Sequence, residues 1–173
     1  MDRNNHYEAA FESYLHERGL CAIAVDETRR SQLGPGPVKS LDFIVHADGG
    51  RLLVDVKGRR FPAGPPGKPR RVWECWSTLE DVSGLTRWVE LFGSPYQGLL
   101  AFAYLLGDEA GLPEDADDLW DWRGRRYLFR GIEVGQYRRH MRTRSPKWGT
   151  VSLPGRAFRE VARPLSYFTR TSG

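Results

Sequence analysis

Apolar side chains recur at helical spacing in three segments of the chain. Tyr7, Phe11 and Leu15 share one face of the first segment, which is the pattern of an amphipathic helix. This helix is expected to end at Gly19, because glycine commonly follows the last helical turn. In the second segment apolar and polar residues fall on opposite sides, as in a helix that covers a sheet. The predicted helices are 5–19, 76–92 and 155–164.

Shorter apolar runs lie between these helices and predict β-strands. The run of eight apolar residues at 99–106 has no polar position, so we expect a central strand that is buried on both faces. Helices that alternate with such strands indicate an α/β fold with a mixed central sheet sandwiched by helices. The length of 173 residues fits a single domain, 1–173. The predicted strands are 21–25, 41–47, 51–57, 99–106 and 126–134.

One predicted strand interrupts its apolar pattern with two charged residues. Asp55 and Lys57 lie two positions apart in the segment 51–57, and a strand points such residues to the same face. Leu53 shares that face, whereas the opposite face holds only apolar residues. A buried strand gains nothing from ionised side chains unless another interaction holds them there. The residues expected on the opposite face are Leu52, Val54 and Val56.

The turn before this strand brings a second acidic residue close to Asp55. If Asp48-Gly49 form a two-residue hairpin turn, Asp42 lies directly opposite Asp55, with the Cβ atoms roughly 5 Å apart. A turn one residue longer would shift this register. Two facing carboxylates repel each other unless a cation lies between them. Lys57 supplies one positive charge, but a divalent metal with oxygen ligands fits the spacing better.

Positive charge is concentrated in two parts of a chain whose formal net charge is only +4. Residues 123–173 hold 13 Arg or Lys against two acidic residues, and residues 51–71 hold seven against Asp55 alone. Basic clusters suit a polyanion such as nucleic acid, although a solvated surface has the same composition. Tyr137 and Trp148 lie among the later basic residues, a combination that suits phosphate contacts and base stacking. The candidate nucleic-acid-binding residues are Arg59, Arg60, Arg70, Arg71, Arg138, Arg139, Arg142, Arg144 and Lys147.

Composition argues against several other classes of protein. Cys21 and Cys75 lie in no CxxC pair, which argues against a cysteine zinc site or a disulfide framework. The longest wholly apolar run has eight residues, too few to cross a membrane. The first residues contain no apolar core of a signal peptide. We therefore expect a soluble cytoplasmic protein without a membrane partner.

The order of the acidic residues resembles a known nuclease pattern. Glu8 on the first helix, Asp42 on one strand and Asp55-Val56-Lys57 on the next are similar to the PD-(D/E)XK nuclease superfamily, in its Holliday-junction-resolvase-like branch. Two departures from that pattern are Leu41, where the superfamily has proline, and Asp55, where glutamate is commoner.

The resemblance covers the first part of the chain only. It extends over residues 5 to about 106 and leaves a basic C-terminal extension, about 123–173, without a counterpart. Within it, the stretch HYEAAFE, His6–Glu12, also resembles a bacterial family named for the pattern HYExAFE.

The superfamily resemblance implies a function and a role for each of these residues. It implies a divalent-metal-dependent nuclease that hydrolyses phosphodiester bonds of nucleic acid, with DNA favoured as substrate and Mg²⁺ or Mn²⁺ as cofactor. Lys57 would orient or deprotonate the attacking water. A second copy of the chain, in a homodimer, is a further implied partner. The implied metal ligands are Asp42, Asp55, the carbonyl of Val56 and Glu8.

Several alternatives stay open at this point. Glu12 lies one helical turn after Glu8 and could be the helix acid instead, and Lys57 could serve only as the salt-bridge partner of Asp55. The same fold could carry a catalytically inactive nucleic-acid-binding module. A protein-interaction domain that uses a Trp-rich surface is the third alternative, and it predicts no salt-dependent binding of DNA.

Overall fold

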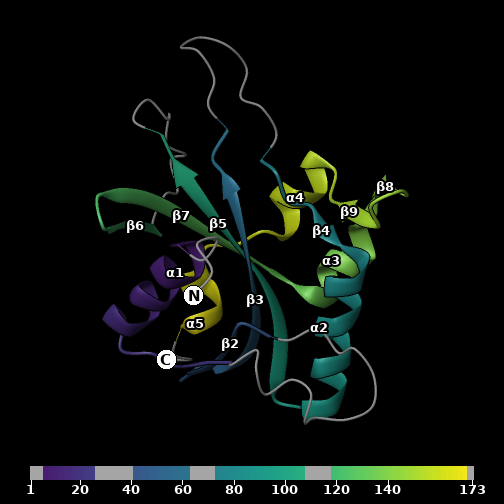
Figure 1. The fold of residues 1–173 in the computed structure, drawn as a ribbon. Helices are drawn as coiled ribbons and strands as arrows, with labels where there is room; N and C mark the ends of the chain where they lie inside the picture. Colours follow the sequence, from purple (N-terminus) through teal and green to yellow (C-terminus); the bar gives the residue numbers. More distant parts are fainter. Residues whose placement is uncertain (1–5, 26–40, 63–72, 108–117, 171–173) are drawn as a thin grey trace.

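The computed structural model describes residues 6–25, 41–62, 73–107 and 118–170, which form two β-sheets and their covering helices (Figure 1). The smaller sheet has three strands, in the order β4 (Ser77–Thr78), β9 (Thr150–Ser152) and β8 (Arg142–Ser145). The larger sheet has six strands, in the order β1 (Cys21–Ala24), β2 (Phe43–Ala47), β3 (Gly50–Arg60), β5 (Tyr96–Leu106), β7 (Arg125–Glu133) and β6 (Leu119–Trp122).

β3 and β5 form the centre of the larger sheet. They run parallel to each other, whereas the other neighbouring strands are antiparallel. A parallel pair needs a long crossover connection, and the helix α2 (Leu79–Phe92) provides it. β5 contains the predicted strand 99–106, and residues 98–104 of it are buried. The prediction of a mixed sheet with a buried central strand is therefore confirmed.

Helices cover both faces of the larger sheet (Figure 1). α1 (His6–Glu17) and α5 (Leu165–Thr169) pack on one face, and α2, α3 (Val134–His140) and α4 (Gly155–Val161) pack on the other. α1 confirms the first predicted helix. Gly19 ends it with a φ of +69°, a left-handed conformation that glycine adopts at little cost. Of the helices in the described ranges, none is both long enough and apolar enough to cross a membrane.

The side chains of β3 alternate between two hydrophobic clusters, as the sequence pattern predicts. Leu53 packs with Val82 and Leu85 of α2. The apolar residues at the alternate positions pack on the other face of the sheet, with α1. Asp55 and Lys57 share the face of Leu53 and therefore project toward α2. The residues on the α1 face are Leu52, Val54 and Val56.

The structure differs from the predicted elements around α2 and in the C-terminal half. α2 begins at Leu79 instead of Trp76, because Thr78 caps the helix by accepting a hydrogen bond from the N–H of Asp81 at 3.0 Å. The acidic segment that follows β5, residues 108–117, lies outside the described residues. The elements that we did not predict are two to seven residues long, too short to show a period: β4, β6, α3, β8, β9 and α5.

A buried aspartate connects α1 with the C-terminal helix α5. Asp118 is fully buried, and its Oδ1 accepts a hydrogen bond from the hydroxyl of Tyr14 at 3.0 Å. Its Oδ2 accepts a hydrogen bond from the N–H of Leu165. A buried carboxylate is costly unless such hydrogen bonds satisfy it. One side chain therefore fixes α1 and α5 beside the start of β6.

Candidate active site

Lys57 lies in a buried cluster of charged side chains. Its Nζ is 3.1 Å from Oδ1 of Asp55 on the same strand and 2.5 Å from Oδ2 of Asp81 on α2. The three side chains are only 12–14% exposed. Burial lowers the pKa of Lys57, but Asp55 and Asp81 outweigh this effect and hold that pKa above its ordinary value. Lys57 is therefore an ammonium group at neutral pH.

Asp81 is a member of this cluster that sequence analysis missed. It stands three positions after the capping residue, and Thr78-x-x-Asp81 is similar to the capping-box pattern of helix starts. That pattern marks the beginning of α2. It gives no sign that the carboxylate reaches Lys57, because this partner lies 24 residues away on another element. The fold alone reveals that contact.

The β2–β3 hairpin has the register that a two-residue turn predicts, except at Asp42. Phe43 pairs with Val54, and the same register continues to the turn at Asp48-Gly49. The pairing ends before Asp42, whose N–H donates to the carbonyl of Val54 at 2.9 Å. Asp42 therefore lies just outside β2 and does not face Asp55 across the ladder, which corrects the predicted pairing.

The carboxyl groups of Asp42 and Asp55 meet in spite of this irregularity. Oδ2 of Asp42 accepts a hydrogen bond from the N–H of Val56 at 2.7 Å, which holds the side chain alongside β3. The Asp42 and Asp55 carboxyl groups also lie close enough to interact, and a proton between them relieves the repulsion of two adjacent carboxylates. Burial, Asp55 and Glu8 together raise the pKa of Asp42 to about 8. Burial also raises the pKa of Asp55, so the pair holds a proton more tightly than exposed aspartates do.

Glu8 is the acidic residue of α1 that interacts with Asp42. Its negative charge contributes to the raised pKa of Asp42. Glu12 lines a separate hollow with His16, Trp122 and Arg123. Of the two alternatives left open by the sequence, the geometry favours Glu8.

The close approach of α1 to β3 depends on Gly58, the residue after Lys57. The ring of Tyr7 lies over this glycine, so that a Cβ atom at position 58 would be 2.1 Å from Cδ2 of Tyr7. No side chain fits in that space. Because Tyr7 directly precedes Glu8, this contact brings the N-terminal end of α1 to the cluster.

The cluster has more negative than positive groups, which favours a bound cation. Loss of the proton between Asp42 and Asp55 would leave two adjacent negative charges in a buried place. Within the described ranges no three His, Cys, Asp or Glu side chains form a ready ligand set for a metal ion. Two carboxylates with a backbone carbonyl do fit a hard divalent cation that keeps several water ligands. Asp42, Asp55 and Asp81 interact with Lys57, and Glu8 acts on Asp42.

We expect Asp42→Asn to lose most of the stabilisation that a divalent metal gives. At ten times its dissociation constant, a metal should stabilise wild type by about 1.4 kcal/mol, a midpoint rise of about 3 to 6 °C. In EDTA, where no metal is bound, Asp42 lowers the free energy of unfolding at high pH instead of raising it. Its pKa rises from 3.8 to about 8 on folding, so the free energy of unfolding falls as pH increases between those values. At pH 8 in EDTA the variant should be no less stable than wild type, since the Asn oxygen can still accept from Val56.

Thermal melts in EDTA and in a series of Mg²⁺ or Mn²⁺ concentrations measure these effects. Asp121→Asn is the matched control, because Asp121 is an aspartate with a 71% exposed side chain on β6. It should keep the full metal response. If Asp42→Asn melts well below wild type in EDTA, Asp42 is a structural hydrogen-bonding residue and the metal site must be abandoned.

The basic residues predicted to bind nucleic acid differ in their exposure and in their contacts with the rest of the protein. The guanidinium of Arg59 stacks on Trp76, with Cζ 3.8 Å from the ring centroid, and donates hydrogen bonds to two backbone carbonyls. Arg60 is exposed at the end of β3. Arg70 and Arg71 lie outside the described residues. The exposed basic residues of α3, β8 and the turn after β8 are Arg138, Arg139, Arg142, Arg144 and Lys147.

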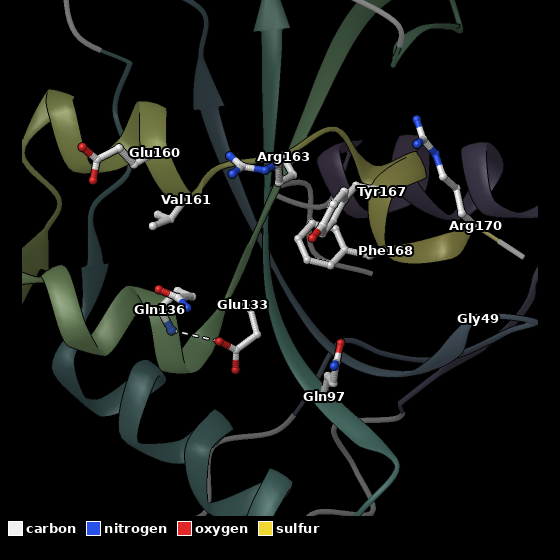
Figure 2. A pocket seen from close by; sticks show the side chains of 10 residues that line it. All are labelled: Gly49, Gln97, Glu133, Gln136, Glu160, Val161, Arg163, Tyr167, Phe168 and Arg170. Carbon is white, nitrogen blue, oxygen red and sulfur yellow. Dashed lines mark hydrogen bonds between the residues drawn. The ribbon is translucent and has the colours of Figure 1, made fainter. Parts of the chain in front are cut away.

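A cavity of about 610 Å³ opens between the larger sheet and the C-terminal helices (Figure 2). Its walls carry both acidic and basic side chains, among them Glu133 and Arg163. Glu133 already caps α3, since its carboxylate accepts hydrogen bonds from the N–H groups of Gly135 and Gln136 at 2.9 Å each. The residues of the Lys57 cluster do not line this cavity. We therefore place the candidate chemistry in the Lys57 cluster.

The comparisons with known proteins bear on the fold. No protein-family model matches the chain, so the likeness of His6–Glu12 to the HYExAFE family stays a prediction. No curated protein matches it either. Among solved structures, the chain is similar to Hjc, a Holliday junction resolvase from the archaeal hyperthermophile Archaeoglobus fulgidus, with a TM-score of 0.58 and 14% sequence identity. The likeness covers 96% of this chain and 99% of that one.

This coverage includes most of the basic C-terminal extension, residues 123–173, which the sequence resemblance left without a counterpart. The same residues contribute β7 to the larger sheet and β8 and β9 to the smaller one. The chain therefore has a mixed α/β fold of the Holliday-junction-resolvase type, which is restriction-endonuclease-like.

Proposed function

We propose that this chain is a divalent-metal-dependent nuclease that hydrolyses phosphodiester bonds of DNA. One observation carries the proposal, namely the buried contact of Asp42 and Asp55 beside Lys57 on a resolvase-type sheet. The fold by itself is insufficient support, because one fold can host unrelated functions. The proposal therefore rests on the chemistry of these three side chains.

Each residue has a separate role in the proposed reaction. Asp42, Asp55 and the carbonyl of Val56 would hold Mg²⁺ or Mn²⁺, with Glu8 as a further ligand. When bound, the metal polarises a phosphate oxygen and lowers the pKa of a coordinated water. Lys57 is fixed by two aspartates and has a raised pKa. It therefore acts as a hydrogen-bond donor that stabilises negative charge developing on the phosphate, rather than as a proton acceptor.

Plasmid nicking tests the proposed function directly. The full chain should convert supercoiled plasmid to nicked or linear DNA in Mg²⁺ or Mn²⁺, and EDTA should stop the reaction. Cleavage that persists in EDTA would contradict the metal dependence. An intact plasmid in every metal would contradict the nuclease itself.

A second candidate function is a catalytically inactive DNA-binding module on the same fold. Two observations favour it: Lys57 is engaged by Asp81 as well as Asp55, and no three His, Cys, Asp or Glu side chains of the described residues form a ready ligand set. Such a module would bind DNA with a strong salt dependence and leave the plasmid intact.

We expect the basic residues of α3 and β8 to bind phosphates of the nucleic-acid backbone. Removing four of their charges should weaken binding to all DNA sequences alike, because phosphate contacts carry no sequence information. The slope of log K against log salt should fall by roughly 0.9 for each duplex phosphate that the variant no longer neutralises. Fluorescence anisotropy across a salt series measures this slope. The four substitutions are Arg138→Ala, Arg139→Ala, Arg142→Ala and Arg144→Ala.

Two exposed arginines on other elements provide the control for this charge removal. Arg51 lies on the second residue of β3, and Arg87 lies on α2. Arg51→Ala with Arg87→Ala should leave the slope unchanged. If the fourfold variant also keeps the wild-type slope, the basic segment is only a solvated face.

A further inference from the structure

The turn between β8 and β9 displays a tryptophan to solvent. Trp148 is 71% exposed, more than any other large apolar side chain in the described part of the chain. The Nζ of Lys147 lies 5.3 Å from the centroid of its ring. A single exposed apolar residue needs no explanation by itself. The positive charge around Trp148 and the ordered turn that carries it distinguish this side chain from other exposed ones.

The turn that carries Trp148 is held in place by hydrogen bonds. The N–H of Trp148 donates to Oγ of Ser145 at 3.4 Å, and the carbonyl of Gly149 accepts from the N–H of Leu79 at 2.8 Å. Gly149 has a φ of +59°, which allows the tight return into β9. The ring is therefore presented by an ordered hairpin, so that little conformational entropy is lost when it binds a partner.

The same hairpin is connected to the candidate active site. Leu79, which bonds to the turn, is the first residue of α2 and stands two positions before Asp81, the partner of Lys57. On β8, Cζ of Arg144 lies 5.2 Å from the ring centroid of Trp76, the ring on which Arg59 also stacks. Figure 1 shows β8 and β9 beside β4, at the N-terminal end of α2.

The surface around Trp148 suits a polyanion. The chain has no acidic residue between Glu133 and Glu160. The basic residues of β8 and its turn are exposed, and no ion pair with an acidic residue of the described ranges neutralises them. A phosphate backbone satisfies these charges, but it leaves an aromatic ring without a partner. These basic residues are Arg142, Arg144 and Lys147.

A nucleic acid with an unpaired base is a polyanion that also offers a flat apolar face. In an intact duplex both faces of each base are covered by its neighbours in the stack, so an aromatic side chain has nothing to stack on. An unpaired base has a free face, and stacking of that face on an aromatic ring is tolerant of sequence.

We propose that Trp148 stacks on an unpaired base and that the β8–β9 hairpin directs the candidate active site to nucleic acid with single-stranded segments. The proposal rests on the proposed nuclease function and deepens it by naming the substrate class. The basic residues of β8 and its turn hold the phosphates, and Trp148 selects strands whose bases are free.

Binding of labelled oligonucleotides in EDTA tests this selection without cleavage. The probes are a single-stranded DNA, an RNA of the same sequence and the fully paired DNA duplex. Trp148→Ala should weaken binding to a single strand by roughly 5- to 150-fold, the effect of removing the stacking of one base. It should leave binding to the duplex unchanged. The difference between the DNA and RNA arms shows which strand the hairpin prefers.

Three further variants identify stacking as the cause. Trp148→Phe should keep most of the affinity for single strands, because it keeps an aromatic face. Trp148→Leu should behave like Trp148→Ala, although it stays apolar. Tyr167→Ala removes another exposed ring, on α5, with 58% exposure, and should bind all probes like wild type. Since Trp148 is exposed, none of its substitutions should lower the melting temperature.

The outcomes separate this proposal from the nuclease proposal. Equal losses on single strands and duplex, or no loss on either, would overturn the role of Trp148. A protein that binds single strands through Trp148 but leaves plasmid intact would support this inference and contradict the nuclease. A protein that nicks plasmid but binds single strands without help from Trp148 would support the nuclease proposal and contradict this inference.

Discussion

Asp55→Asn and Lys57→Ala should each slow metal-dependent plasmid cleavage by at least about a hundredfold, the lower end of what one positioned catalytic group contributes. On the proposed mechanism, Asp55→Asn would lose a charge that holds the metal, and Lys57→Ala would remove the ammonium group that stabilises the phosphate. DNA affinity should change by only a few-fold, because phosphate contacts elsewhere dominate binding. Nicking rates at saturating Mg²⁺, with anisotropy in EDTA, measure both quantities.

The buried position of Lys57 requires a control for folding. Lys57→Ala leaves Asp55 and Asp81 without their cation, and a broken buried ion pair is strongly destabilising. Lys57→Arg keeps the positive charge but changes its shape and its donor geometry. It should stay folded and still cleave slowly. Thermal melts of both variants show whether a decrease in activity reflects chemistry or unfolding.

Two further aspartate variants complete this experiment. Asp81→Asn should slow cleavage less than Asp55→Asn does, because Lys57 keeps its contact with Asp55 at 3.1 Å. The exposed-site control Asp121→Asn should cleave like wild type. A wild-type rate in either Asp55→Asn or Lys57→Ala would show that the reaction takes place elsewhere.

Gly58→Ala should lower the free energy of unfolding by about 3 kcal/mol, the upper part of the usual range for overpacking. The added Cβ atom would lie 2.1 Å from the ring of Tyr7, a distance that real Cβ atoms essentially never show. Relief of this clash requires the Tyr7 ring to rotate or α1 to move away from β3. Because Glu8 follows Tyr7 on α1, cleavage should decrease together with stability. Urea denaturation followed by circular dichroism measures the decrease in stability.

A glycine on the same strand serves as the matched control. A Cβ atom at Gly50 meets nothing within 4 Å, so Gly50→Ala should unfold close to wild type. Tyr7→Ala combined with Gly58→Ala should cost less than the sum of the two single substitutions, since the change at Tyr7 removes the clash. If Gly58→Ala is as stable as Gly50→Ala, the Tyr7 ring does not cover Gly58 in solution.

The sequence predicts those features that depend on local periodicity or on one turn. The run at 99–106 predicts β5, and alternation along β3 predicts the shared face of Asp55 and Lys57. The turn at Asp48-Gly49 predicts the hairpin register. In each case the deciding residues are neighbours in the chain, so the pattern contains the necessary information.

The features that sequence analysis missed depend on distant partners. The carbonyl of Asp42 accepts a hydrogen bond from Val25 at 3.0 Å, so its place is set by the β1 side as well as by β3. Asp81 on α2 contacts Lys57 on β3, which lies 24 residues earlier in the chain. The smaller sheet pairs Ser77 with Val151, two residues far apart in sequence on strands too short to show alternation.

The hydrogen bonds of Asp118 set when the chain can complete its folding during synthesis. Its two hydrogen-bonding partners, Tyr14 and Leu165, are separated from it by 104 and 47 residues. The ribosome releases Tyr14 well before Leu165. Until Leu165 emerges, the Asp118 carboxylate lacks one of the donors that make its burial tolerable. The helix that carries Glu8 is therefore secured late, and a nascent chain reaches its mature arrangement only after Leu165 has been translated.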